Sequence, residues 1–565
     1  MAKREKKSLG ENLVEVGIIT KEQYAEALKE EKLAGLRFRK AIVKMGYITD
    51  EDLVVFISNK LGIPRIELGN YLIDSKIIDL IPEELARKHE LVPILKIGNR
   101  LTCAMVDPWN VFALDEARSV SGLIIEPAIA TEEEIKQAIT EYYSAKGSVK
   151  ELLKAIDDNK VRQEAARGAG GETVSSEGTI IIKLVNSLIM NAIHEGASDI
   201  HIEPEEEILK TRYRVDGMLH EVTSPPKYLQ SSVISRIKIM ANLNIAETRV
   251  PQDGRFSIKM EGRDIDVRVS AVPTIYGENI VMRLLDVANT VLKLEELGFS
   301  KDMLQKFEKL IIRPHGILLV TGPTGSGKTT TLYASLSRIN TVEKNIITIE
   351  DPVEYKLEGI RQIQVNPKVN LTFAGGLRSI LRQDPDIIMV GEIRDLETVE
   401  IAVHAALTGH LVFSTLHTND AAGAITRMID MGSEPFLVAS SVIGVLAQRL
   451  VRKICVECKE EYAPTQEALR DIGLDAKGQK TKIKFFRGKG CSKCMSTGYK
   501  GRIGIYELMV MNEDLRTMTI GKASSEEIRK KAVSQGMAVL KDDGIRKIRE
   551  GITTVEEVLR VTQEE

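Results

Sequence analysis

The chain of 565 residues has few aromatic residues, little net charge and no long apolar run. Aromatic residues make up 4% of it, which argues against a surface that stacks nucleic-acid bases. The formal net charge of −3 argues against bare nucleic acid as the main partner. No apolar run approaches the length of about 18 residues that a membrane-spanning helix needs. The basic start lacks the apolar segment of a signal peptide, so we expect a cytosolic protein that reaches any membrane through partners.

Cysteine is also scarce, with five residues, which in a cytosolic chain argues against disulfides. Four of the five form two C-x-x-C pairs, and such pairs fit the two halves of a tetrahedral Cys₄ zinc site. The alternative is four reduced thiols. A zinc ion held by four protein ligands has no open position for catalysis, so its role would be structural. The predicted ligands are Cys455, Cys458, Cys491 and Cys494.

The length predicts three or four domains, at roughly 150 residues per domain. Composition shifts and apolar periodicity then suggest where they lie. The expected segments are a helical N-terminal repeat domain (1–63), a small α/β domain (64–143), a linker (144–179), a mixed α/β domain (180–290), a second α/β unit around a glycine-rich loop (291–445), the cysteine-bearing segment (446–510) and a helical C-terminal region (511–565).

The glycine-rich loop at 322–329 is a complete phosphate-binding motif between an apolar strand and a helix. This arrangement aims backbone N–H groups and the positive end of a helix dipole at a phosphate. Lys328 would reach the β- and γ-phosphates, and the Thr329 hydroxyl would hold Mg²⁺. The loop therefore predicts that a nucleoside triphosphate such as ATP is bound. The expected binding residues are Gly322, Pro323, Thr324, Gly325, Ser326, Gly327, Lys328, Thr329 and Thr330.

Two further apolar strands end in acids. Strand 387–391 is followed by Glu392, a Walker B arrangement, and strand 346–349 leads to Glu350 and Glu354. A parallel α/β sheet keeps its ligand crevice at this edge. Like charges repel unless a cation lies between them, so we expect Mg²⁺ there. One of these acids could instead orient or deprotonate the attacking water.

A third strand, 411–416, leads into a loop that contains His417. Its imidazole could sense the γ-phosphate through a hydrogen bond. A lone histidine is more often structural, and the spacing leaves both interpretations open.

Several of these segments resemble one family. Residues 348–355 resemble the Asp box of secretion and pilus ATPases, residues 384–395 their Walker B segment and residues 414–421 their His box. With the phosphate-binding loop, four motifs occur in the family's order, and the resemblance covers residues 180–510. The chain looks like an ATPase of the PilB type, from pilus assembly, or of the related GspE type, from type II secretion. The resemblance implies a multidomain α/β fold, with a RecA-like P-loop core after a PAS-like α/β domain, N-terminal helical and α+β domains and a Cys₄ insert.

The same resemblance assigns roles to residues. Glu354 would activate the water, Glu392 would be the Mg²⁺-linked acid and His417 the γ-phosphate sensor. In the family, arginines of the preceding domain reach the nucleotide across the cleft between two domains. The alternative for such arginines is surface salt bridging. The matching residues are Arg268, Arg283 and Arg255.

The N-terminus contains an internal repeat, in which residues 8–20 align with 37–49. Each copy predicts a helix, a glycine stop and a second helix with a threonine N-cap. The pattern resembles the paired motif of cyclic-di-GMP-binding domains found on these ATPases. Ser8 stands where an arginine is expected, and Arg37-Phe38-Arg39 replaces Arg-Leu-Gly. These departures argue against cyclic-di-GMP binding, and a small helical bundle is the plainer interpretation.

The resemblance implies a hexameric, Mg²⁺-dependent ATPase at the inner face of the cytoplasmic membrane. It would add pilin subunits to a growing fibre through an inner-membrane platform protein. The tetracysteine segment and the long N-terminal region argue against a retraction ATPase, which lacks both. Three alternatives remain. One is a type II secretion ATPase, one from another class is a DNA translocase or helicase, and the third is a regulatory cyclic-di-GMP-binding module.

Overall fold

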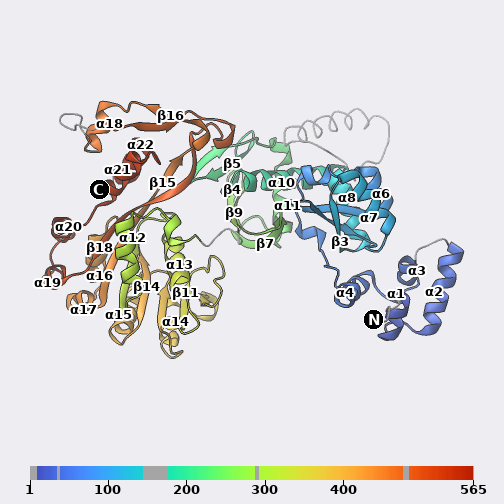
Figure 1. The fold of residues 1–565 in the computed structure, drawn as a ribbon, viewed down its shortest axis with the longest axis horizontal. Coiled ribbons are helices and arrows are strands. Elements are labelled where there is room, and N and C mark those ends of the chain that lie inside the picture. Colours follow the sequence, from blue (N-terminus) through green and yellow to red (C-terminus); the bar gives the residue numbers. More distant parts are fainter. Residues whose placement is uncertain (1–8, 35–37, 144–175, 287–291, 475–482, 564–565) are drawn as a thin grey trace. The chain divides into compact units, whose positions relative to one another are not determined.

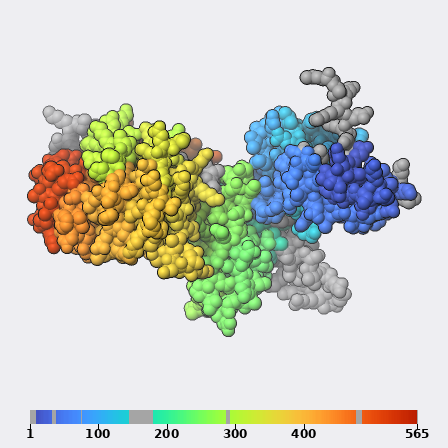
Figure 2. Space-filling model, turned by 90° about the horizontal axis from the view of Figure 1, so that it is seen from below, coloured from blue at the N-terminus to red at the C-terminus, as the bar shows by residue number. Residues whose placement is uncertain are grey.

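The computed structural model describes residues 9–34, 38–143, 176–286, 292–474 and 483–563 (Figure 1). It divides into two compact units, Met1–Ala288 and Asn289–Glu565. In Figure 2 the first unit is coloured from blue to green and the second from yellow-green to red. The expected linker, 144–179, lies outside the described residues except for 176–179, which already belong to helix α10 (Ser176–His194).

The N-terminal repeat forms two helix pairs. Gly17 and Gly46 end the first helix of each pair, with φ of 78° and 71°. The hydroxyls of Thr20 and Thr49 accept hydrogen bonds of 3.1 Å from backbone N–H groups of the following helix. The predicted pattern of helix, glycine stop and threonine cap is thus confirmed. The helices are α1 (Leu9–Glu15), α2 (Lys21–Ala34), α3 (Phe38–Lys44) and α4 (Asp50–Leu61).

A three-stranded sheet follows, with β1 and β2 antiparallel and β2 and β3 parallel. Four helices pack with it around one apolar core. Helix α7 makes the crossover between the parallel strands, as such a connection requires. The elements are α5 (Ser75–Ile78), α6 (Glu83–His89), β1 (Leu91–Ile97), β2 (Arg100–Met105), α7 (Val111–Ser121), β3 (Ile124–Ile129) and α8 (Glu132–Tyr143).

The next sheet is antiparallel, in the order β6-β5-β4-β9-β8-β7. Helices α10 and α11 contribute to its core. The backbone N–H of Leu72 donates to Lys259 O of β7 at 2.8 Å, so a preceding segment joins this strand. The elements are β4 (Ala197–Pro204), β5 (Leu209–Val215), β6 (Met218–Glu221), α11 (Gln230–Met240), β7 (Gln252–Met260), β8 (Arg263–Thr274) and β9 (Gly277–Asp286).

The second unit contains a seven-stranded sheet in the order β12-β11-β13-β14-β10-β15-β18. All neighbours are parallel except β15 and β18. Strands β10, β11, β13 and β14 are buried along their length, as expected for a parallel sheet covered on both faces. The strands are β10 (Gly316–Thr321), β11 (Ile346–Glu350), β12 (Arg361–Gln364), β13 (Ile387–Val390), β14 (Leu411–Leu416), β15 (Val442–Ile454) and β18 (Tyr499–Val510).

Two apolar clusters, one centred on α15 and α16 and the other on α12 and α13, join the helices to this sheet. Ser300 caps α12 and Asp395 caps α15, because each side chain accepts a backbone N–H of the first turn. The helices are α12 (Lys301–Ile311), α13 (Lys328–Ile339), α14 (Phe373–Ile380), α15 (Leu396–Leu407), α16 (Ala421–Asp430) and α17 (Pro435–Ser441).

The cysteine-bearing segment is not separate from this sheet. The expected boundary at 446 falls inside β15, whereas the one at 510 coincides with the end of β18. These two strands pair antiparallel, from Gly444 to Ile454 of β15. The cysteines lie beyond the far ends of these two long strands. The remaining elements are β16 (Lys459–Tyr462), α18 (Gln466–Asp471), β17 (Phe485–Gly488), α19 (Glu513–Ile520), α20 (Ser525–Ser534), α21 (Leu540–Arg549) and α22 (Val555–Thr562).

Among the described helices, none is both long enough and apolar enough to cross a membrane.

Candidate functional site

The phosphate-binding loop joins buried β10 to α13, which begins at Lys328. Gly325 and Gly327 have φ of 78° and 88°, a conformation that favours glycine. A Cβ at Gly327 would lie 2.8 Å from Gln448 Nε2, so the loop also needs glycine for close packing. Ser326 is buried, and its hydroxyl has no hydrogen-bond partner within the described residues. A loop with an unpaired buried hydroxyl is suited to bind an anion such as a nucleotide phosphate.

Lys328 folds back onto its own loop. Its Nζ donates to the carbonyl oxygens of Gly322 at 2.7 Å and Pro323 at 3.1 Å. Burial lowers the pKa of Lys328 to about 8; the Glu392 carboxylate opposes this shift and Arg449 adds to it. The ammonium group therefore lies within the loop and is available to phosphate oxygens.

Glu392 and His417 lie together. The His417 Nε2 is 3.3 Å from Glu392 Oε2, and the other carboxylate oxygen pairs with Arg394. The Glu392 side chain is only 13% exposed, and its charge acts on Lys328. Strands β13, β14 and β10 are neighbours in the sheet and end at the same edge, so the fold brings these predicted residues together.

The two acids predicted at the end of β11 differ in their surroundings. Glu350 is 2% exposed, and its carboxylate accepts hydrogen bonds from Thr348 Oγ1, Gln362 Nε2 and the Tyr333 hydroxyl. Burial raises the pKa of Glu350, although these three hydrogen bonds oppose the shift. These neutral donors satisfy the hydrogen bonding of the Glu350 carboxylate within the protein, and Mg²⁺ at this edge of the sheet stays a prediction. Glu354 is half-buried, in the loop that follows.

Two residues of the site, Arg449 and Gln448, were missed from the sequence. Arg449 is 7% exposed, and its guanidinium donates to Asn419 Oδ1 at 3.2 Å. A Cβ at Gly322 would lie 3.2 Å from Arg449 Nη1, so the guanidinium lies against the phosphate-binding loop. Gln448 accepts a hydrogen bond of 2.8 Å from Thr331 of α13. The available signal was the adjacent polar pair Gln448 and Arg449 inside an otherwise apolar stretch, 442–451, which forms a buried strand.

The three predicted arginines form one row across the antiparallel sheet. Arg255 pairs in register with Arg268, and Arg268 with Arg283. The next residue in the row is Asp199, whose carboxylate lies 3.0 Å from Arg283 Nε. Residues directly opposite on neighbouring strands share one face of the sheet, so the register places the three arginines on the same face. The surface salt bridge, named above as the alternative role, is therefore present at Arg283. That the three arginines act on a nucleotide stays a prediction.

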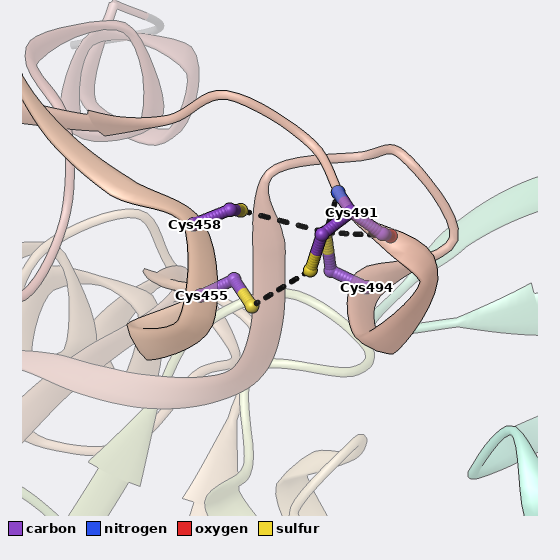
Figure 3. A group of neighbouring side chains, drawn as sticks. All are labelled: Cys455, Cys458, Cys491 and Cys494. Carbon is purple, nitrogen blue, oxygen red and sulfur yellow. Dashed lines mark hydrogen bonds between the residues drawn. The ribbon is translucent and has the colours of Figure 1, made fainter.

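The four predicted zinc ligands converge from two turns (Figure 3). The Sγ atoms lie 3.9 Å apart in Cys455 and Cys491, 3.8 Å in Cys458 and Cys494, and 3.7 Å in Cys491 and Cys494. A tetrahedron with Zn–S bonds of about 2.3 Å has S–S edges of about 3.8 Å, so the geometry fits Zn²⁺.

Backbone donors also suit thiolates at this cluster. Gly490 N–H donates to Cys458 Sγ at 3.3 Å, while Cys491 and Gly498 N–H groups donate to Cys494 Sγ at 3.2 and 3.3 Å. Burial raises the pKa of Cys494, but the two N–H donors and the thiols of Cys491 and Cys458 together lower the pKa to about 6. Burial raises the pKa of Cys458 to about 12, although the Gly490 N–H opposes the shift. The thiolate is the form that binds metal.

In the second N-terminal repeat, the side chain of Arg39 is buried rather than exposed to solvent. Arg39 is 8% exposed, and its guanidinium pairs with Asp50 at 2.7 Å. A hollow of about 700 Å³ beside it is lined by basic and acidic residues, and Lys44 and Lys136 are among the basic ones. Ser8 and Arg37, which also carry the departures from the family motif, lie outside the described residues.

The chain matches known families along most of its length. A family profile described as "Type II/IV secretion system protein" matches residues 174–560, and one for the MshEN domain matches residues 61–149. The MshEN match begins after the repeat at 8–49, on which the resemblance to cyclic-di-GMP-binding domains rested.

Individual relatives are similar over nearly the whole chain. The type IV pilus assembly ATPase PilB of Myxococcus xanthus is 46% identical over 557 residues, which cover 98% of both chains. The type II secretion system protein E of Xanthomonas campestris is 44% identical over 541 residues, 94% of both chains. The type II secretion system ATPase E of Vibrio cholerae is 49% identical over 462 residues, 81% of this chain and 91% of the relative.

Solved structures support the fold. The ATPase DotB of Legionella pneumophila matches with a TM-score of 0.50 at 22% identity, covering 67% of this chain and 95% of DotB. DotB of Yersinia pseudotuberculosis matches with a TM-score of 0.52 at 21% identity, covering 68% and 94%.

Proposed function

Because the chain belongs to the type II/IV secretion system family and is an ATPase, we propose that it powers type IV pilus assembly. The observation that carries the proposal is the meeting of Lys328, Glu392 and His417 at one edge of the sheet, next to a loop that fits a phosphate. The relative named PilB extends the similarity over 98% of both chains.

Bound ATP would supply the phosphoryl group, and Mg²⁺ would neutralise its charge. Lys328 would turn from the loop carbonyls to the phosphates, and Thr329 and Glu392 would hold the metal. His417, 3.3 Å from Glu392, would report the γ-phosphate to the end of β14. Glu354 would accept a proton from the attacking water. Arg449 would hold the phosphate-binding loop and Asn419 in place, because its guanidinium lies against the loop and donates to Asn419.

The row of Arg255, Arg268 and Arg283 would supply further positive charge to the same nucleotide. An arginine directed at the transferring phosphate raises turnover by about 10³–10⁵ in other NTPases. Closure of the arginine-bearing sheet on the nucleotide would turn hydrolysis into movement. This arrangement suits a ring, and the family implies a homo-hexamer at the inner face of the cytoplasmic membrane.

Zn²⁺ bound by Cys455, Cys458, Cys491 and Cys494 would stabilise the far ends of β15 and β18. The lobe around it would contact an inner-membrane platform protein, through which movement reaches the pilin subunits. No nucleic-acid partner is expected, because the chain has neither excess positive charge nor many aromatic residues.

The N-terminal region would regulate the motor, and cyclic-di-GMP is a candidate ligand because the MshEN domain matches at residues 61–149. The buried ion pair of Arg39 and Asp50 argues against cyclic-di-GMP binding at the second repeat, because the Arg39 guanidinium is already paired. A binding isotherm with cyclic-di-GMP on the full chain tests this, and no binding up to millimolar ligand would remove the ligand from the account.

Deletion of the gene in the source cell tests the main proposal, with surface pili and secreted enzymes scored together. Loss of pili with normal secretion is expected. A chromosomal Glu354→Gln variant should give the same phenotype, because it keeps the protein but removes the base.

Type II secretion is the second candidate, since relatives of that name are 44–49% identical over 81–94% of this chain. Intact pili with lost secretion in the deletion strain would establish it and overturn pilus assembly.

A further inference from the structure

The hydroxyl of Tyr333 occupies a central place beside the nucleotide site. Tyr333 lies on α13, the helix that begins with Lys328, and its side chain is fully buried. The hydroxyl donates to Glu350 and accepts from the backbone N–H of Glu354 at 3.4 Å and from Gln362 Nε2 at 3.3 Å. One phenol oxygen thus links the helix of the phosphate-binding loop to the backbone of the residue expected to activate water.

Gln362 of β12 fixes the same loop from the other side. Its amide nitrogen donates to Tyr355 O at 3.1 Å, and its amide oxygen accepts Leu357 N–H at 2.8 Å. The Tyr355 ring packs edge-on against Tyr333, with centroids 4.6 Å apart. Contacts from α13 and β12 therefore restrain the backbone on either side of Glu354.

Glu350 gives this network its anchor. The buried carboxylate has three donors, one of which is Tyr333. Removing that donor would leave a buried carboxylate oxygen unsatisfied, which is costly. The Tyr333 hydroxyl is therefore held in a single position, and so is the N–H that donates to it.

We propose that Tyr333 is a positioning residue for Glu354, which it holds through its hydroxyl at a fixed distance from the phosphate-binding helix. The proposal rests on the proposed role of Glu354. A carboxylate that must meet a water in line with the γ-phosphate tolerates little displacement, because misplacement by about 1 Å costs up to about 10²-fold in rate. Tyr333 touches neither nucleotide nor water in this account, and acts only through the loop.

The first test is Tyr333→Phe in the full chain, with ATP turnover and nucleotide affinity measured separately. The ring still packs on Tyr355, and only the hydroxyl is lost. We expect kcat to fall between about 10- and 100-fold, with the Kd for ATP within about twofold of wild type. Tyr143→Phe is the matched control, because it removes another buried hydroxyl, which donates to Ile81 O at 3.0 Å far from the loop in sequence. Its kcat should not change.

The second test is the double variant Tyr333→Phe, Glu354→Gln, studied by single-turnover hydrolysis. If Tyr333 acts through Glu354, the double variant should be no slower than Glu354→Gln alone. Multiplied losses would overturn the proposal, as would an unchanged kcat for Tyr333→Phe. Gln362→Met should reproduce the fall in kcat, and provides the same test if Tyr333→Phe does not fold. Wild-type turnover in Glu354→Gln would instead reject the role proposed for Glu354.

Discussion

The tetracysteine cluster and the phosphate-binding loop lie in the same unit and differ in how much of each site that unit supplies. The cluster collects four sulfur atoms at tetrahedral spacing from two turns. At the phosphate-binding loop, the Glu392 carboxylate pairs with Arg394, and its charge acts on Lys328 next to Arg449. The four cysteines are all supplied by one lobe, whereas we propose that the ATP site takes further positive charge from the row of Arg255, Arg268 and Arg283.

The largest effect should come from breaking the metal site. Cys494→Ser removes one thiolate, and structural zinc contributes on the order of 10 kcal/mol of apparent folding free energy. We expect bound zinc to fall from one ion per chain to well below one, with a large drop in melting temperature. Metal analysis of the purified protein measures the first and calorimetry the second.

Cys103→Ala is the control for this change, since the fifth cysteine lies buried in β2 away from the cluster. It should keep its zinc. Full stability of Cys494→Ser without zinc would show that the four thiols need no metal.

The next effect should come from the loop itself. Lys328→Ala removes the ammonium group next to Gly322 and Pro323, and loss of one such donor costs about 10²–10³ in rate. ATP turnover should fall by that factor, while zinc content stays at one ion per chain. Zinc loss in this variant would contradict the independence of the two sites.

A smaller effect is expected from pH. Below pH 8 Lys328 carries its proton, because its pKa is lowered only to about 8. As pH rises through 8, the free protein loses this proton and must regain it to bind phosphate. The Kd for ATP should therefore rise by about tenfold per pH unit above 8. Titrations of nucleotide at pH 7, 8 and 9 measure this, and the dependence should disappear in Lys328→Ala.

Much of the site was predictable from local sequence. The phosphate-binding loop, the acids after β11 and β13, and the cysteine pairs are each set by a few neighbouring residues. Their spacing alone indicates their chemistry. The threonine caps at Thr20 and Thr49 were predictable for the same reason.

What the sequence could not show depends on contacts between distant segments. The sequence does not show that Tyr333 and Gln362 lie against Glu350 and donate hydrogen bonds to its carboxylate. The row of Arg255, Arg268 and Arg283 depends on strand register, which is set by hairpins rather than by the arginines. Similarly, β15 joins the main sheet by pairing with β10, and β18 joins it by pairing with β15 across the cysteine-bearing insertion.

The most direct test of the central claim, that the ATP site must receive positive charge from the arginine-bearing sheet, is Arg268→Ala in the full chain. ATP turnover, the Kd for ATP and zinc content should be measured on one preparation. The account predicts that turnover falls by about 10³-fold or more, with zinc unchanged and ATP still bound. Turnover at the wild-type rate would contradict it, and would show that the phosphate-binding loop and its own unit are sufficient.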